Sequence, residues 1–244
     1  MNAALERYSW LAGVGLLVAL SVGGYWFVSA LRRNPPLGTI AVRNGQIQSF
    51  WLPDSSHVVL QGDSQLLYPI RGFGGNLRQV ALRGQAYWEI RAGRRPLRIR
   101  CDSLYIETLG PASCNVRWRD GRLELTAISG RFTLRAPNGS WTLEEWQRLV
   151  WPHPAQVEAV EPFRYAQWRF GMLYFANTPL KEVLEELRRA WDLRLEADSG
   201  LLGRPVSGRF SSEQTFAEVL RELAVQVRAR VVPTEDGWRL EGEG

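Results

Sequence analysis

The chain has 244 residues, two cysteines and 45% hydrophobic residues, a composition typical of globular protein that excludes a disulfide framework or a disordered tail. The net charge of +5 combines two opposite segments, because residues 71–135 hold 13 arginines against five acids and residues 136–244 hold 13 basic residues against 17 acids. The balance is therefore +8 followed by −4. The arginines are scattered along strand-like runs without an aromatic RNA-binding signature, so we expect solvated strand faces and no nucleic-acid partner.

Residues 8–31 form the first predicted element, because these 24 consecutive residues carry no charge and most are apolar. At about 1.5 Å of rise per residue, such a helix would cross a hydrocarbon core of about 30 Å. Trp10 at one end and Tyr25 and Trp26 at the other are the predicted membrane-interface residues. We expect a cytoplasmic stub at 1–7, a single transmembrane helix at 8–31 and a linker at 32–38.

Two points about this segment stay open from the residues alone. A signal peptide cleaved near Val28-Ser29-Ala30 is an alternative to a permanent anchor. Arg32 and Arg33 follow the span whereas only Arg7 precedes it, which by the positive-inside rule favours a cytoplasmic location for the long part. Long domains translocate largely regardless of such charges, so the sidedness is not decided.

Residues 39–155 contain short strand-like runs separated by turn signals such as Asn44-Gly45, Asp120-Gly121 and Asn138-Gly139. This spacing predicts an antiparallel all-β domain. If residues 97–101, 104–109 and 114–118 form a simple meander, Cys101 and Cys114 start from opposite ends of the middle strand. They would then be about 16 Å apart at roughly 3.3 Å per residue, so we expect two free thiols.

Residues 156–244 predict a small α/β domain. Trp168–Phe175 reads as a strand broken by Gly171, and a helix over residues 180–191 is expected to begin with Thr178 as N-cap and Pro179 in the first position. A second helix follows the capping-box pattern at residues 215–218. The segment EVLEEL at 182–187 returns 36 residues later as EVLREL at 218–223, and each helix precedes a short strand. We therefore expect a duplicated βαβ unit whose core residues are Val183, Leu184, Leu187, Val219, Leu220 and Leu223.

The residues with potential chemistry do not form a reactive constellation. Asp54, Ser55, Ser56 and His57 contain the members of a hydrolytic triad, but neighbours along one turn cannot converge on one point. The two histidines and two cysteines match no standard zinc spacing. We therefore expect no catalytic residues, no metal site, no cofactor and no small-molecule substrate. The acidic helix face of Glu182, Glu185 and Glu186 is expected to be solvated.

Several distributed motifs resemble the FecR family of membrane-anchored signal transducers. These are LPDSS at 52–56 with VVL at 58–60, RQV at 78–80, GQAYWEI at 84–90 and residues 110–116. Residues 168–187 resemble the short N-terminal domain of secretins and TonB-dependent receptors. The resemblance implies an inner-membrane protein with most of its chain in the periplasm, which binds the signalling domain of an outer-membrane TonB-dependent transporter and relays to sigma-factor regulation.

The sequence departs from the family in one large respect, because the seven residues before the predicted span are too few for a cytoplasmic anti-sigma domain. The rival hypothesis is therefore a structural subunit of a cell-envelope complex that has kept the fold without signalling. For either function, a protein partner is expected to add a strand to a free sheet edge. The predicted contact residues are Trp168, Phe170, Leu173 and Phe175.

Overall fold

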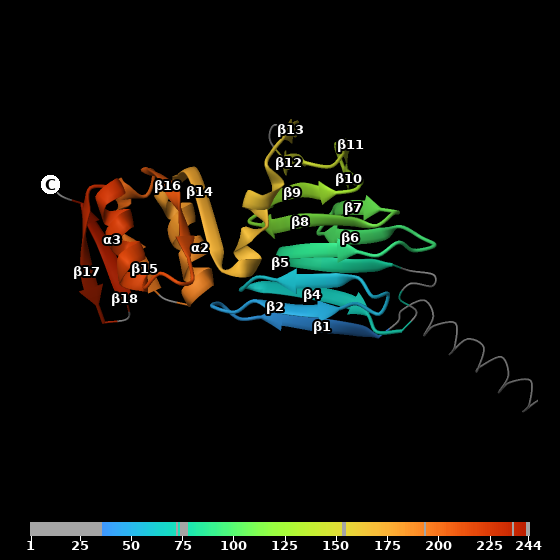
Figure 1. Ribbon diagram of the computed structural model, residues 1–244, viewed down its shortest axis with the longest axis horizontal. Helices are drawn as coiled ribbons and strands as arrows, with labels where there is room; N and C mark the ends of the chain where they lie inside the picture. Colours follow the sequence, from blue (N-terminus) through green and yellow to red (C-terminus); the bar gives the residue numbers. More distant parts are fainter. Residues whose placement is uncertain are drawn as a thin grey trace, which may run out of the picture.

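The computed structural model describes residues 36–71, 73, 78–152, 155–192, 194–235 and 237–242. The helix predicted at residues 8–31, with its interface residues Trp10, Tyr25 and Trp26, lies outside these ranges. Within them, every helix is too short or too polar to span a bilayer. Two packed units follow one another along the chain (Figure 1): a β unit, residues 37–159, and a C-terminal unit, residues 172–242.

The β unit contains thirteen strands in the described ranges. They are β1 (Leu37–Val42), β2 (Gln48–Trp51), β3 (His57–Leu60), β4 (Ser64–Pro69), β5 (Gln79–Ile90), β6 (Leu97–Cys101), β7 (Leu104–Thr108), β8 (Ala112–Arg119), β9 (Arg122–Ser129), β10 (Phe132–Ala136), β11 (Gly139–Leu143), β12 (Gln147–Trp151) and β13 (Val157–Ala159). Residues 141–143 belong to β11 and residues 147–150 to β12, with a turn between them.

The 12-residue strand β5 joins the two halves of this sheet system. Its first part pairs with β4 and β6, and its second part pairs with β3 and β8. The change occurs at Gly84, whose φ of +95° lies in the region that favours glycine. A Cβ built there would stand 2.4 Å from the Ser64 Oγ, so no other residue fits without displacement.

The core of the β unit lies between the two halves. Leu66, Ile99 and Leu134 come from one half, and Trp88 and Leu125 come from the other; all are fully or almost fully buried. Alternation of buried and exposed residues along strands such as β6 and β7 gives each half one apolar face. Burial of these faces against each other is the main favourable term for this unit.

The C-terminal unit contains two α-helices in its described residues, α2 (Leu180–Trp191) and α3 (Phe216–Gln226). Two 3-10 helices, η1 (Pro162–Tyr165) and η2 (Gln167–Phe170), precede it, and a third, η3 (Ser199–Leu201), lies within it. Its strands are β14 (Met172–Pro179), β15 (Arg194–Ala197), β16 (Pro205–Ser211), β17 (Ala229–Thr234) and β18 (Gly237–Gly242). Figure 1 shows the helices between a β14–β16 pair, which faces the β unit, and a β15–β18–β17 sheet at the far end.

The helix stripes behave as the sequence predicts. Val183, Leu184, Leu187, Val219, Leu220 and Leu223 are all buried, which confirms them as core. The capping box of α3 is also confirmed, because Thr215 and Glu218 bond reciprocally to each other's backbone N–H. The predicted start of α2 is wrong by one residue: Pro179 is the N-cap, and Thr178 lies in β14 and makes no capping bond.

The structure corrects the expected fold class of a single transmembrane helix, an antiparallel domain and a duplicated βαβ domain. The described residues are mostly strand, and none of their helices can span a membrane. The β unit is not wholly antiparallel, since Gln79–Ala81 of β5 runs parallel to Arg98–Arg100 of β6. A parallel pairing needs a crossover between the two paired stretches. Here the rest of β5 forms part of that crossover, so a short loop between β5 and β6 is enough. The C-terminal repeat is not a βαβ unit either, because β14 and β15 flank α2 but belong to different sheets.

Candidate functional site

The segment predicted as a contact strand, Trp168–Phe175, is not one continuous strand. Residues 167–170 form η2, and β14 begins at Met172. Between them Gly171 has φ +74°, and its N–H donates to the Trp168 carbonyl oxygen at 2.9 Å. The glycine that the sequence predicts as an interruption of a strand is therefore the left-handed end of a helical turn.

The four predicted contact residues differ in exposure. Trp168, Leu173 and Phe175 are buried, whereas Phe170 is 66% exposed. The Trp168 indole N–H donates to the Asn115 Oδ1 at 2.9 Å, which ties η2, packed on the core of the C-terminal unit, to β8. Phe175 packs near Phe210 in the C-terminal core. Of the four residues, only Phe170 presents most of its side chain to a partner.

The free edge of β14 opens onto a hollow between the two units, which we call the junction groove. In the part of the chain that the structure describes, β14 pairs with β16 alone. The groove has a volume of about 490 Å³ and is lined by residues 172–179 of β14, by strands β8, β9 and β12, and by α2. A polar backbone edge thus faces a space that an extended segment of another protein can enter.

Charged residues of opposite units meet at this groove. Glu186 of α2 accepts from Arg117 of β8 at 2.9 Å and from Arg189 at 2.9 Å, and it is 7% exposed. The expectation that the acidic face of this helix is solvated is therefore wrong for Glu186. The signal for this contact was present in the sequence as the +8 and −4 segments, which the fold brings together.

The electrostatic balance favours the charged forms of Glu124 and Arg117. Burial alone raises the pKa of the Glu124 carboxyl, but the charges of Arg117 and Arg148 outweigh it and hold that pKa below its usual value. Burial lowers the pKa of Arg117, and Glu186 and Glu124 outweigh this and raise it. At Arg119 the compensation is incomplete: burial and the neighbouring Arg189 lower its pKa to about 10, although Glu186 and Asp63 act in the opposite direction.

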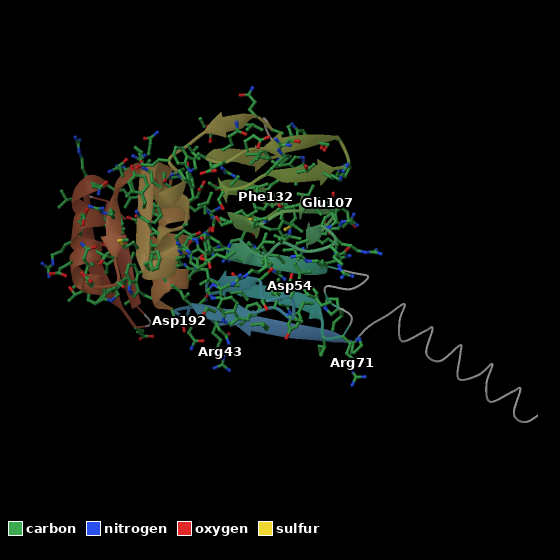
Figure 2. All side chains as sticks on the ribbon, turned by 45° about the vertical axis from the view of Figure 1, so that its right-hand side comes forward. Arg43, Asp54, Arg71, Glu107, Phe132 and Asp192 are labelled. Carbon is green, nitrogen blue, oxygen red and sulfur yellow. The ribbon has the colours of Figure 1, made fainter. Side chains whose placement is uncertain are left out.

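A second set of contacts lies on the other side of Trp168. The Arg169 guanidinium stands 3.8 Å from the centre of the Tyr87 ring and 3.4 Å from the Glu89 carboxylate. Burial is the main cause of the raised pKa of the Tyr87 hydroxyl. The loop after β1 adds a backbone contact, because the Gly45 N–H donates to the Arg189 carbonyl oxygen at 2.5 Å. Arg43 and Asp192, labelled in Figure 2, mark this end of the junction.

Asp54, which Figure 2 labels on the β unit away from the C-terminal unit, has a structural role. The Asp54 carboxylate accepts from the Ser56 N–H at 2.9 Å and from Arg78 at 2.8 Å, and Arg78 also donates to the Arg91 carbonyl oxygen. The Ser56 hydroxyl accepts from the Arg91 N–H at 3.1 Å. These hydrogen bonds connect the turn before β3 with the loops at the two ends of β5. The groups therefore stabilise a turn and do not form a hydrolytic triad.

Comparisons with known proteins agree with this architecture. Residues 38–132 match the family model described as FecR protein. Two crystal structures of a candidate anti-sigma factor from Parabacteroides distasonis ATCC 8503 are similar, each at 20% sequence identity. The first has a TM-score of 0.78, and the match covers 86% of this chain and 100% of the crystallised chain. The second has a TM-score of 0.77, and the match covers 85% of this chain and 100% of the crystallised chain. No curated protein sequence matches the chain.

The family match covers β1 to the start of β10, so this part of the β unit is FecR-like. The two crystal structures extend the shared fold over most of the chain, including residues beyond the family match. The motifs that carry the resemblance in sequence, LPDSS and GQAYWEI, lie at the turn before β3 and in β5. Those motifs build the fold, and apart from Gln85 the junction groove is formed by other residues.

Proposed function

We propose that this chain is a FecR-type signal-transduction regulator that works by binding another protein at the junction groove. The observation that carries the proposal is the free edge of β14 facing that groove. A partner strand added there would gain main-chain hydrogen bonds from β14 and contacts with both units at once. The bound partner would therefore contact the β unit as well as the C-terminal unit.

The proposed partner is the signalling domain of an outer-membrane TonB-dependent transporter, with relay to sigma-factor regulation. The FecR-like β unit and the fold shared with a candidate anti-sigma factor support this choice. The corresponding location is the periplasmic side of the bacterial inner membrane. The proposed mechanism is protein binding without catalysis, in keeping with a regulator family that is not a class of enzymes.

Retention of the partner by the full-length chain tests the proposal. We would tag the chain, mix it with the signalling domain of a transporter from the same genome, and measure the retained fraction. Two proline variants locate the contact, Leu173→Pro and Tyr174→Pro. Successive residues of a strand point their N–H groups to opposite sides, so one proline removes a bond to β16 and the other removes a donor from the free edge.

We expect the proline variant that leaves the bonds to β16 intact to keep a native circular dichroism spectrum. This same variant should no longer retain the signalling domain. Ser140→Pro on β11, far along the β unit, serves as the matched control. Normal retention by both proline variants would show that the β14 edge is not the contact.

A structural subunit of an envelope complex is the second candidate function. The large ion-pair network at the junction favours it, because a scaffold needs two units held in one arrangement. Deletion of the gene separates the two functions: loss of a transcriptional response to the transporter's ligand supports the regulator, and loss of an assembled complex with an intact response supports the scaffold.

A further inference from the structure

One end of the β unit carries a row of exposed aliphatic side chains. Leu37, Ile70 and Leu109 are 58%, 54% and 59% exposed. Leu37 begins β1, Ile70 follows β4 and Leu109 follows β7. The strand register brings these three points to one end of the sheet, because the start of β1 pairs with the end of β4, and the start of β6 pairs with both the start of β5 and the end of β7. At about 4.8 Å per strand, the row is about 19 Å long.

The loops at this end add positive charge. Arg71 directly follows Ile70, and Arg91 and Arg94 lie in the loop that leads to β6. Arg78 holds this loop in place by donating to the Arg91 carbonyl oxygen at 2.8 Å. Arg71, Arg91 and Arg94 are exposed, and none of them forms an ion pair with a residue that the structure describes. We call these three arginines and the three aliphatic residues together the rim.

The acids near the rim are largely neutralised by arginines outside it. Glu107 accepts from Arg98 at 2.7 Å, and Asp54 contacts Arg78 at 2.8 Å. Glu145 has no ion pair within the described ranges, but it follows β11, the last strand of this half, which is the farthest from β1. The rim therefore presents a net positive charge beside its aliphatic side chains.

This combination suits the surface of an anionic bilayer. Guanidinium groups are attracted to lipid phosphates, and aliphatic side chains leave water when they enter the boundary between headgroups and acyl chains. A nucleic acid would also attract the arginines, but it has no apolar layer for the aliphatic side chains. Single-stranded nucleic acid is bound by aromatic stacking, and the rim pairs its cations with alkyl groups instead.

The course of the chain also favours a lipid partner. The uncharged stretch 8–31 ends six residues before Leu37. At no more than about 3.6 Å per residue, this connection spans at most about 22 Å. A mostly apolar stretch partitions out of water, so a bilayer that takes it up would lie within that reach of the rim. Figures 1 and 2 show β1 and Arg71 on the side of the β unit away from the C-terminal unit, so a bilayer there leaves the junction groove open.

We infer that the rim docks on the surface of a bilayer that contains anionic lipid, with its three arginines at the headgroup phosphates and its three aliphatic side chains in the interfacial layer. This inference goes beyond the proposed function, because it concerns the opposite side of the molecule from the junction groove and does not require a signalling domain. Docking in this way would turn the groove away from the lipid.

Quenching of a fluorophore by spin-labelled lipid tests the inference on the full-length chain. The fluorophore is attached to Leu109→Cys, and Cys101 and Cys114 do not compete for it because both are fully buried. We compare vesicles of phosphatidylcholine with vesicles of equal parts phosphatidylcholine and phosphatidylglycerol. Quenching should be at least about threefold greater in the anionic vesicles. A label at Val225→Cys, 80% exposed on α3, is the control and should show no such difference.

A variant without the rim charge tests the role of the arginines. Each arginine near an anionic surface contributes roughly fivefold to affinity, so the triple variant should lose the preference for anionic vesicles. Its substitutions are Arg71→Gln, Arg91→Gln and Arg94→Gln. The matched control removes the same charge from exposed positions of the C-terminal unit and should keep the preference. Its substitutions are Arg209→Gln, Arg221→Gln and Arg228→Gln. Circular dichroism confirms that both variants are folded.

Equal quenching at Leu109→Cys in the two kinds of vesicle would overturn the inference, as would a preference that survives the rim substitutions or is lost equally in the control. A response of this label to duplex RNA without any preference for anionic vesicles would assign the rim to nucleic acid instead. The retention assay with the signalling domain fails or succeeds separately, because the rim variant keeps the whole junction groove.

Discussion

Glu186 is the residue that connects the two units most directly. Its carboxylate contacts Arg117 from the β unit, Arg189 from its own helix and the Gln61 amide. Sequence periodicity placed it on the solvated face of α2, because a helical wheel describes only one helix and contains no information about a second unit packed across that face. The opposite charges of the two chain segments are a feature from which this contact could have been inferred, but they were interpreted as solvated faces.

Glu186→Ala should lower the free energy of unfolding by about 2 kcal/mol, because it leaves Arg117 partly buried without its closest carboxylate. Breaking a fully buried ion pair costs roughly 3–5 kcal/mol. We expect a smaller loss here, because the Arg117 side chain is 24% exposed. Urea titration followed by circular dichroism measures it. Glu241→Ala, which removes a surface partner of Arg230, should cost under about 1 kcal/mol. Equal losses in the two variants would contradict a special contribution of Glu186.

The two cysteines show where residue-level prediction succeeded for the wrong reason. Both thiols are free, as expected, and both are buried. The meander used to separate them is wrong, because β7 pairs with β6 and β10 whereas β8 pairs with β5 and β9. Both side chains enter the same core, where burial raises the pKa of each thiol and the Cys101 group adds to that of Cys114. Strand order depends on non-local pairing, which no local pattern reveals.

At the scale of elements, strands β8, β9 and β12 are held side by side by ion pairs as well as by the backbone ladder. Glu124 of β9 contacts Arg148 of β12 at 2.8 Å and Arg117 of β8 at 3.9 Å. Glu107 of β7 has the same function between Arg98 and Arg135 on the opposite half. The scattered arginines expected to be solvated are therefore in part cross-strand partners of acids.

The stability of the protein should fall in acid through Glu124. Its folded-state pKa lies below the value near 4.3 expected for an unfolded chain, because Arg117 and Arg148 outweigh the effect of burial. Its contribution is therefore present above pH of about 4.3 and is lost as the pH falls through the lowered folded-state pKa. Glu124→Gln should give a smaller drop in the urea midpoint between neutral and acidic pH than wild type. A drop as steep as that of wild type would exclude Glu124 as a source.

Element prediction was most accurate where periodicity and capping were local. The stripes of α2 and α3 and the capping box at Thr215 follow from neighbouring residues. The placement of β14 and β15 in different sheets does not, because it depends on which pairs bury the two helices from both sides. The candidate site was predicted only in part for the same reason: the segment was identified, but its neighbours across the junction were not.

At the scale of the whole molecule, the two units share one apolar contact surface. The hydrophobic cluster of the C-terminal unit includes Val59 and Tyr87 of the β unit, and Trp168 packs into this cluster. Together with the Arg117–Glu186 pair, this surface holds the units in a fixed arrangement. A partner at the junction groove would therefore encounter a preformed site, which lowers the entropic cost of binding.

Trp168→Ala should uncouple the two units. Truncation of a buried tryptophan costs about 3–5 kcal/mol, and here it also leaves the Asn115 Oδ1 without the indole donor. We expect calorimetry to show two separate unfolding transitions where wild type shows a single one. Phe170→Ala, two residues away at an exposed side chain, should keep the single transition. A single transition in the Trp168 variant, merely shifted to lower temperature, would mean that other contacts suffice for coupling.

The strand β5 also determines how fast this molecule can reach its native state. Its pairings reach back to His57 and forward to Trp118, through the His57–Glu89 and Gly84–Trp118 pairs. Such contacts between residues distant in sequence require loops to close before any pairing energy is gained. Folding of the β unit should therefore take milliseconds to seconds, as in other proteins dominated by non-local strand pairing. Until β8 has been synthesised, one side of β5 remains without its strand, so the nascent chain exposes an aggregation-prone edge during its production.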